Sequence, residues 1–192
     1  KKKDEKYKDL SPEERFFYEN LDRYETIVCR SALKSGAENE REYLDPDGGF
    51  VKNCMTSFVK NLVYSQNGLC RDSELRDDNG YEVDLDKAYA EISSRLSPRI
   101  KVTRNAHESY YWENVTVDVA DGVCLILVRD LPLKILNVWV NKVDSGREHG
   151  KRLSPDRLGE FCDMVEHILD IYGKYKELTL KRAAGIREKL GL

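Results

Sequence analysis

Nucleophilic catalysis in this chain would draw on three histidines and five cysteines. Such chemistry needs a thiol or hydroxyl within hydrogen-bond reach of a base. His107, His149 and His167 have no recognisable nucleophile signature beside them, and no G-x-S-x-G turn occurs. A Cys–His pair brought together by folding stays open, because linear spacing does not test it. We interpret His167 as an ordinary helical histidine and predict no catalytic residue.

Three carboxylates near one predicted strand raise the alternative of a metal-dependent enzyme. Glu113, Asp118 and Asp121 lie on or beside that strand, and carboxylates at strand ends hold the divalent ion of many nucleases. No E-x-K triplet lies on the adjoining strand, and an exposed sheet face would carry the same residue types. A nuclease-like site built from these carboxylates, with His107 near them, is therefore the third function considered.

Metal and phosphate motifs are missing from the sequence. The cysteines are Cys29, Cys54, Cys70, Cys124 and Cys162, and none forms a C-x-x-C or C-x-x-H pair, so we predict no structural zinc site. No G-x-x-x-x-G-K-[ST] or G-x-G-x-x-G run occurs, which excludes ordinary P-loop NTPases and dinucleotide-binding enzymes. We predict neither a metal nor a cofactor.

Basic side chains in two stretches make nucleic-acid binding the alternative function. Residues 142–157 and 174–189 hold them, and phosphate contacts need such clusters. Tyr110, Tyr111 and Trp112 would stack on bases if exposed. Cations near a helix C-terminus also follow from the macrodipole alone, which is the competing explanation. The candidate phosphate-binding residues are Arg147, Lys151, Arg152, Lys181 and Arg182.

The charge balance restricts where such a surface would lie. The 192 residues carry a net charge of -3, and 35% are charged, against roughly 25% in ordinary globular domains. A uniformly basic protein is therefore excluded. Cancelling charges at this density predict long solvated helix faces. The acidic excess collects in residues 69–86, while the N-terminal tail, 142–157 and the final helix lean basic.

Two predicted helix starts share one capping pattern. Residues 11–14, Ser-Pro-Glu-Glu, combine an N-cap serine, a proline at the first helical position and a capping-box glutamate. Apolar residues every three or four positions then predict a helix of about six turns, ending near Ser35-Gly36. Ser154-Pro155-Asp156 repeats the pattern before the last helix. Two further helices are predicted over 50–64 and 85–96.

A change of period from 3.6 to 2 predicts strands within residues 98–144. Residues 115–119 alternate valine with polar side chains, and Asp121-Gly122 is a hairpin signal that needs positive φ. Residues 123–128 are continuously apolar, which predicts a central strand covered on both faces. Residues 133–143 resume the strand pattern. We predict an antiparallel meander of three strong strands and one weaker strand.

The last helix carries a regular apolar seam. Its spacings alternate between three and four residues, which is a heptad pattern more regular than packing on one's own core requires. The two tyrosines at its end suit interfaces. Packing on the sheet of its own domain is the competing explanation, because the seam is shorter than three clean heptads. The predicted interaction residues are Leu158, Phe161, Val165, Ile168, Tyr172 and Tyr175.

The predicted fold class is α+β, with N-terminal helices, a central antiparallel β-meander of three to four strands and a long C-terminal helix packed on the sheet. A flexible tail is expected over 1–10 and a single domain over 11–192. That domain divides into a helical part (11–97), the β-meander (98–144) and the C-terminal helix (154–190).

These patterns favour a non-catalytic intracellular protein-interaction module that binds a protein partner or itself through the last helix. Free cysteines, odd in number, are typical of the reducing cytoplasm. The longest mostly apolar run, Val123 to Val128, is too short to cross a bilayer, and no secretory signal is visible. We therefore expect a cytoplasmic protein with no membrane partner.

Overall fold

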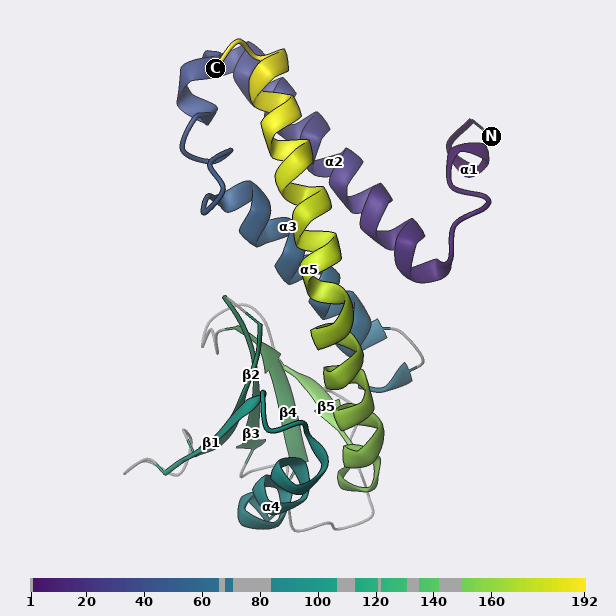
Figure 1. The fold of residues 1–192 in the computed structure, drawn as a ribbon, viewed down its shortest axis with the longest axis vertical. Coiled ribbons are helices and arrows are strands. Elements are labelled where there is room, and N and C mark those ends of the chain that lie inside the picture. Colours follow the sequence, from purple (N-terminus) through teal and green to yellow (C-terminus); the bar gives the residue numbers. More distant parts are fainter. Residues whose placement is uncertain are drawn as a thin grey trace. The chain divides into compact units, whose positions relative to one another are not determined.

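The computed structural model describes residues 2–65, 68–70, 84–106, 113–120, 122–130, 135–141 and 150–192. Figure 1 shows its helices and strands. The chain divides into two compact units, here named the helical unit (Lys1–Asn61 with Ile171–Leu192) and the sheet unit (Leu62–Asp170). The single domain expected over 11–192 stays a prediction.

The helical unit is built from long helices whose starts follow the capping signals. Ser11 Oγ accepts a hydrogen bond from the Glu14 amide at 3.2 Å, and the Ser11 amide donates to Glu14 Oε1 at 3.3 Å, so the predicted capping box is confirmed. Gly36 ends this helix at φ 95°. The elements are α1 (Lys2–Lys6), α2 (Pro12–Ser35), a 3-10 turn (Ala37–Glu40), α3 (Gly49–Lys60) and α5 (Leu158–Lys189), the last from Ile171 onward.

An aromatic cluster forms the centre of the helical unit. The ring of Phe17 on α2 lies 5.6 Å from Phe58 on α3 and 4.6 Å from Tyr175 on α5, and the last two rings are 4.4 Å apart. All three side chains are buried. Aromatic pairs at such distances add stabilisation beyond their buried area. Three segments that are far apart in the sequence are therefore held by one cluster.

The predicted helix over 50–64 changes its geometry near its end. The α-helical hydrogen bonding of α3 stops at Lys60, and a π-helical turn covers Asn61–Ser65. The wide apolar face predicted for this helix is confirmed, since its apolar side chains are buried. They are Phe50, Val51, Cys54, Met55, Phe58 and Val59.

The sheet unit contains one antiparallel meander in the order β1-β2-β3-β4-β5. The predicted α+β class is thereby confirmed. The fifth strand was not predicted, because its three residues are too few to show a period-2 pattern. The elements are α4 (Leu85–Arg95), β1 (Lys101–Asn105), β2 (Asn114–Ala120), β3 (Val123–Asp130), β4 (Ile135–Val140) and β5 (Lys151–Leu153).

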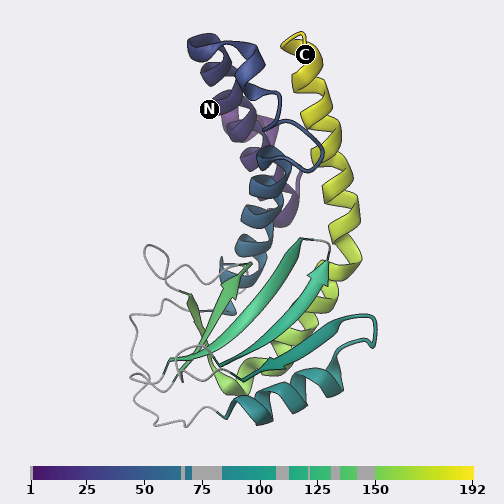
Figure 2. The ribbon, with the colours of Figure 1, turned by 90° about the vertical axis from the view of Figure 1, so that its left-hand side faces the viewer.

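One face of this sheet forms the core of the unit. Val115, Leu127 and Val138 are register partners on neighbouring strands and are 0% exposed. Figure 2 shows the first turns of α5 and helix α4 packed along the sheet. On the opposite face of the central strand β3, Cys124 and Ile126 are only half-buried. Val128 on the same face is 9% exposed, so coverage of this strand on both faces stays a prediction.

The start of α5 differs from the prediction made from Ser154-Pro155-Asp156. The Ser154 hydroxyl bonds to the Asp156 carboxylate and does not cap the helix. Pro155–Arg157 form a 3-10 turn, and α5 begins only at Leu158. Within the described part of the chain, no helix is long and apolar enough to span a membrane.

Candidate functional site

The six residues of the predicted interaction seam are buried within the units to which they belong. Leu158, Phe161, Val165 and Ile168 lie in the sheet unit, and Tyr172 and Tyr175 lie in the helical unit. None is more than 7% exposed. Four of the six side chains are therefore buried in the sheet unit, whereas the two tyrosines are buried in the helical unit and not on the sheet. Self-association through the seam stays a prediction.

The candidate phosphate-binding residues fall in two units and differ in exposure. Arg152 on β5 is only 6% exposed, and its neighbour Lys151 is half-buried. On α5, Arg182 Nη1 contacts Asp22 Oδ1 at 2.7 Å and Glu25 at 3.9 Å, whereas Lys181 is exposed. Arg147 and the predicted stacking residues 110–112 lie outside the described residues.

The carboxylates considered for a metal-dependent enzyme are not gathered in the described structure. Glu113 accepts from the Arg104 guanidinium at 3.5 Å. Asp118 is exposed on β2 opposite Lys101. Asp121, His107 and His149 lie outside the described residues, and His167 is exposed on α5. No group of three His, Cys, Asp or Glu residues in the described segments is placed to hold a metal ion. A nuclease-like site stays a prediction.

Burial holds the deepest cysteines in the thiol form. It raises the pKa of Cys54 and Cys70 to about 12 and that of Cys162 to about 11. Because a thiol reacts as its thiolate, these three side chains are poor nucleophiles at neutral pH. They are small hydrophobic members of the two cores. All five cysteines are free.

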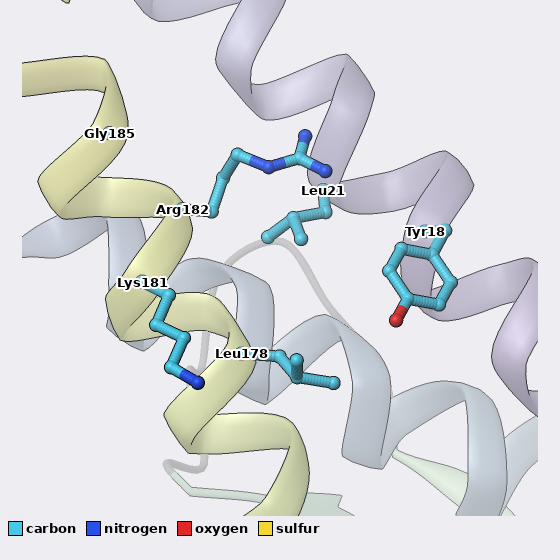
Figure 3. Close-up of a pocket in the computed structure, with 6 residues that line it drawn as sticks. All are labelled: Tyr18, Leu21, Leu178, Lys181, Arg182 and Gly185. Carbon is cyan, nitrogen blue, oxygen red and sulfur yellow. The ribbon is translucent and has the colours of Figure 1, made fainter.

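A groove lies between α2 and α5 on the helical unit. Its volume is about 320 Å³. Tyr18 and Leu21 line it from α2, and Leu178 and Gly185 from α5, so its lining is mostly apolar. Figure 3 shows Lys181 and Arg182 extending from α5 beside these side chains. The groove therefore combines an apolar floor with cationic side chains on the α5 side.

Asp22 organises the charges beside the groove. Its carboxylate accepts hydrogen bonds from Lys6 Nζ at 2.8 Å, from Arg182 Nη1 at 2.7 Å and from the hydroxyl of buried Tyr7. Burial alone would raise the pKa of Asp22, but the hydrogen bonds from Arg182, Lys6 and Tyr7 outweigh it and lower that pKa. One carboxylate thereby joins α5 and the N-terminal segment to α2.

Residues 1–10, for which a flexible tail was expected, take part in this network. Lys2–Lys6 form α1, and Tyr7 is 5% exposed. This contact was not predicted from the sequence. Tyr7 is the one aromatic residue among residues 1–10, and this is the signal that could have indicated it. The flexibility of this tail stays a prediction.

Two large apolar side chains are exposed on α2. Leu33 is 88% exposed and Ile27 is 53% exposed. Single exposed apolar residues are common on protein surfaces. They do not line the groove, so α2 has exposed apolar side chains outside it.

No protein-family model matches this chain, and neither a curated protein nor a solved structure gives a match.

Proposed function

We propose that this chain is a non-catalytic protein-interaction module whose contact surface lies on the helical unit. The groove between α2 and α5 is the observation that carries the proposal. Leu21, Leu178 and Tyr18 line it together with the cationic Lys181 and Arg182. Grooves of this chemistry accept the apolar face of a helix, and the volume of about 320 Å³ lies at the lower end of the range for binding pockets.

Leu33 supports the same proposal from outside the groove. It is 88% exposed on α2, and burying one leucine side chain contributes about 1.5–3 kcal/mol. A partner that covers the C-terminal part of α2 would gain this free energy. We therefore include Leu33 in the contact surface.

Photo-crosslinking from Leu33 tests the proposal. A benzophenone side chain replaces Leu33 in one variant and Lys52, exposed on α3 of the same unit, in a matched control. We expect a defined protein adduct from position 33, either to a second copy or to another protein, and none from position 52. If neither position forms an adduct and sedimentation shows a monomer from micromolar to millimolar concentration, the proposal is wrong.

Self-association is one form of this function, and nucleic-acid binding is the second candidate. Exposed Lys174, Lys181 and Lys189 on α5 favour the second candidate, because phosphate contacts depend on such side chains. Binding to a single-stranded oligonucleotide should then fall steeply with salt, and Lys181→Glu should reduce the salt slope by about one. Binding with no salt dependence would remove this candidate.

We also propose that the chain works in a reducing compartment such as the cytoplasm. The five free cysteines support this location, because oxidising compartments favour disulfides. Alkylation of the denatured native protein should modify all five thiols, as read by intact mass. A mass showing a disulfide would contradict the location.

A further inference from the structure

The exposed side of α5 carries a second seven-residue repeat beside the buried seam. Ile171, Leu178 and Gly185 on α5 are each seven positions apart. Residues at this spacing lie on one face of a helix. Ile171 and Leu178 are half-buried, and Gly185 is exposed. This stripe runs through the groove, because Leu178 and Gly185 both line it.

A row of lysines borders that stripe. Lys174 and Lys181 are seven residues apart, Lys189 follows eight residues later, and all three are exposed. At 100° per residue, the apolar stripe and the lysine row fall within about 80° of the helix circumference. Lys181 lines the groove itself, and Lys174 lies on the same side of the apolar stripe two turns earlier. Lys189 lies on the other edge of the stripe.

The cations of α5 are not equally available to a partner. Arg182 is held by Asp22 and Glu25 within the helical unit. Lys181 contacts Glu177 at 3.7 Å, with both side chains about 70% exposed. Exposed pairs of this kind contribute between zero and about 1 kcal/mol. A carboxylate of a partner can therefore replace Glu177 at little cost, whereas Arg182 stays part of the groove wall.

Gly185 keeps the groove open. A Cβ placed on Gly185 would meet no atom within 4 Å, and the same holds for Gly173. Gly173 lies five residues before Leu178, which places it about 140° around the helix from that lining residue. The two glycines are thus a matched pair, since a Cβ has space at both, but only position 185 lines the groove.

We infer that the groove between α2 and α5 binds an acidic amphipathic helix of a partner protein. The apolar face of that helix packs against Leu21 and Leu178 above Gly185, and its carboxylates contact Lys181 and the neighbouring lysines. A second copy is a poorer occupant, because a two-fold contact centred on Lys181 would bring the lysine rows of both copies together. This inference rests on the proposed function and names its partner chemistry.

A synthetic helix of about six turns, with leucine along one face and glutamate at the flanking positions, is the probe for fluorescence anisotropy with the full chain. Two control peptides have lysine in place of glutamate, or the same residues with the leucines shuffled. We expect the acidic amphipathic peptide to bind, with an affinity that falls as salt rises. Neither control peptide should bind comparably.

Matched variants locate the binding site. Gly185→Leu should weaken the acidic peptide by about tenfold or more, which corresponds to about 1.4 kcal/mol, while Gly173→Leu leaves the affinity within about twofold. Lys181→Glu should weaken binding and flatten its salt dependence, whereas Lys52→Glu on α3 should not. Both glycine variants should fold, because leucine has the higher helix propensity.

Four outcomes would overturn the inference. The first two are no binding of the acidic peptide at millimolar concentration and equal binding of the lysine-substituted peptide. The third is equal weakening by Gly173→Leu and Gly185→Leu. The fourth is a single-stranded oligonucleotide that binds better than the peptide and is unaffected by Gly185→Leu. A failure here is distinguishable from failure of the proposed function. If the peptide does not bind but position 33 still forms a protein adduct, the function stands and the partner chemistry is wrong.

Discussion

The helical unit and the sheet unit carry opposite net charges. The helical unit has 18 basic and 15 acidic side chains, a net charge of +3, whereas the sheet unit has 14 basic and 20 acidic side chains, a net charge of −6. The total of −3 is the sum of two unlike parts. A near-neutral sequence can therefore still contain a basic part, and here the basic excess lies in the last helix, where residues 171–192 have six basic and two acidic side chains.

The cores of the two units also differ in the sequence separation between the residues that form them. The aromatic cluster of the helical unit joins residues 17, 58 and 175, while each strand of the sheet pairs with the next one along the chain. Trp112 and Trp139 both belong to the sheet unit. Tryptophan fluorescence therefore reports on the sheet unit, while circular dichroism at 222 nm reports mainly on the long helices.

The largest expected effect is the loss of the aromatic cluster. Phe17→Ala should destabilise the helical unit by about 3–5 kcal/mol, because it removes a buried ring and leaves a cavity. In urea unfolding, the midpoint followed at 222 nm should fall more than the midpoint followed by fluorescence. Equal shifts of both signals would show one cooperative domain and would remove the distinction between the units.

The matching core substitution tests the sheet unit. Leu127→Ala truncates a side chain that is 0% exposed on β3, so we expect a loss of about 2–5 kcal/mol. The fluorescence midpoint should now fall more than the midpoint at 222 nm. A shift confined to the helical signal would contradict the assignment of Leu127 to a separate core.

Asp22→Asn should cost about 1–3 kcal/mol, because hydrogen bonds from charged donors are lost, and the cost should depend on pH. The pKa of Asp22 is lowered below its ordinary value of 3.8. Its contribution is therefore present above the unfolded pKa and is lost as pH falls through the folded pKa.

Urea midpoints at 222 nm, measured from neutral to strongly acidic pH, check this prediction. The difference between the native chain and Asp22→Asn should be largest near neutral pH and shrink below about pH 4. Asp47→Asn, at an exposed position of the same unit, is the control and should change little. A difference that stays constant at all pH values would exclude an ionised Asp22 as its source.

The smallest expected effect compares the two Ser-Pro turns. Ser11→Ala removes a side-chain cap and should destabilise the helical unit by about 1 kcal/mol. Ser154→Ala should cost less, because Ser154 makes no cap to the helix that follows. Midpoints at 222 nm measure both losses. A larger loss for Ser154→Ala would reverse the assignment of the two turns.

The elements with strong local signals were predictable from the sequence. The boundaries of α2 follow from the cap at Ser11 and the break at Gly36, and the hairpin before β3 follows from Asp121-Gly122, where Gly122 has φ 79°. Strand β5 and the 3-10 turn before α5 were not predictable. β5 depends on pairing with β4, and the turn depends on which partner the Ser154 hydroxyl takes.

The candidate site was less predictable than the fold. The spacing of apolar residues predicted the regular seam of α5. Spacing alone does not distinguish a seam that faces a partner from one that faces its own core. The groove needs Leu21 and Leu178 from segments more than 150 residues apart. Because Gly185 has no side chain, the apolar repeat of α5 is interrupted in the groove, and the sequence pattern did not indicate a groove there. The role of Asp22 depends on three donors whose convergence only tertiary structure produces.

The most direct test of a contact surface on the helical unit is an NMR titration of the ¹⁵N-labelled chain with the acidic amphipathic peptide. Shift changes should collect in residues 18–25 of α2 and 174–189 of α5, while the amides of β2, β3 and β4 stay unchanged. The same titration with Gly185→Leu should show these changes strongly reduced. Shift changes confined to the sheet unit would contradict the account.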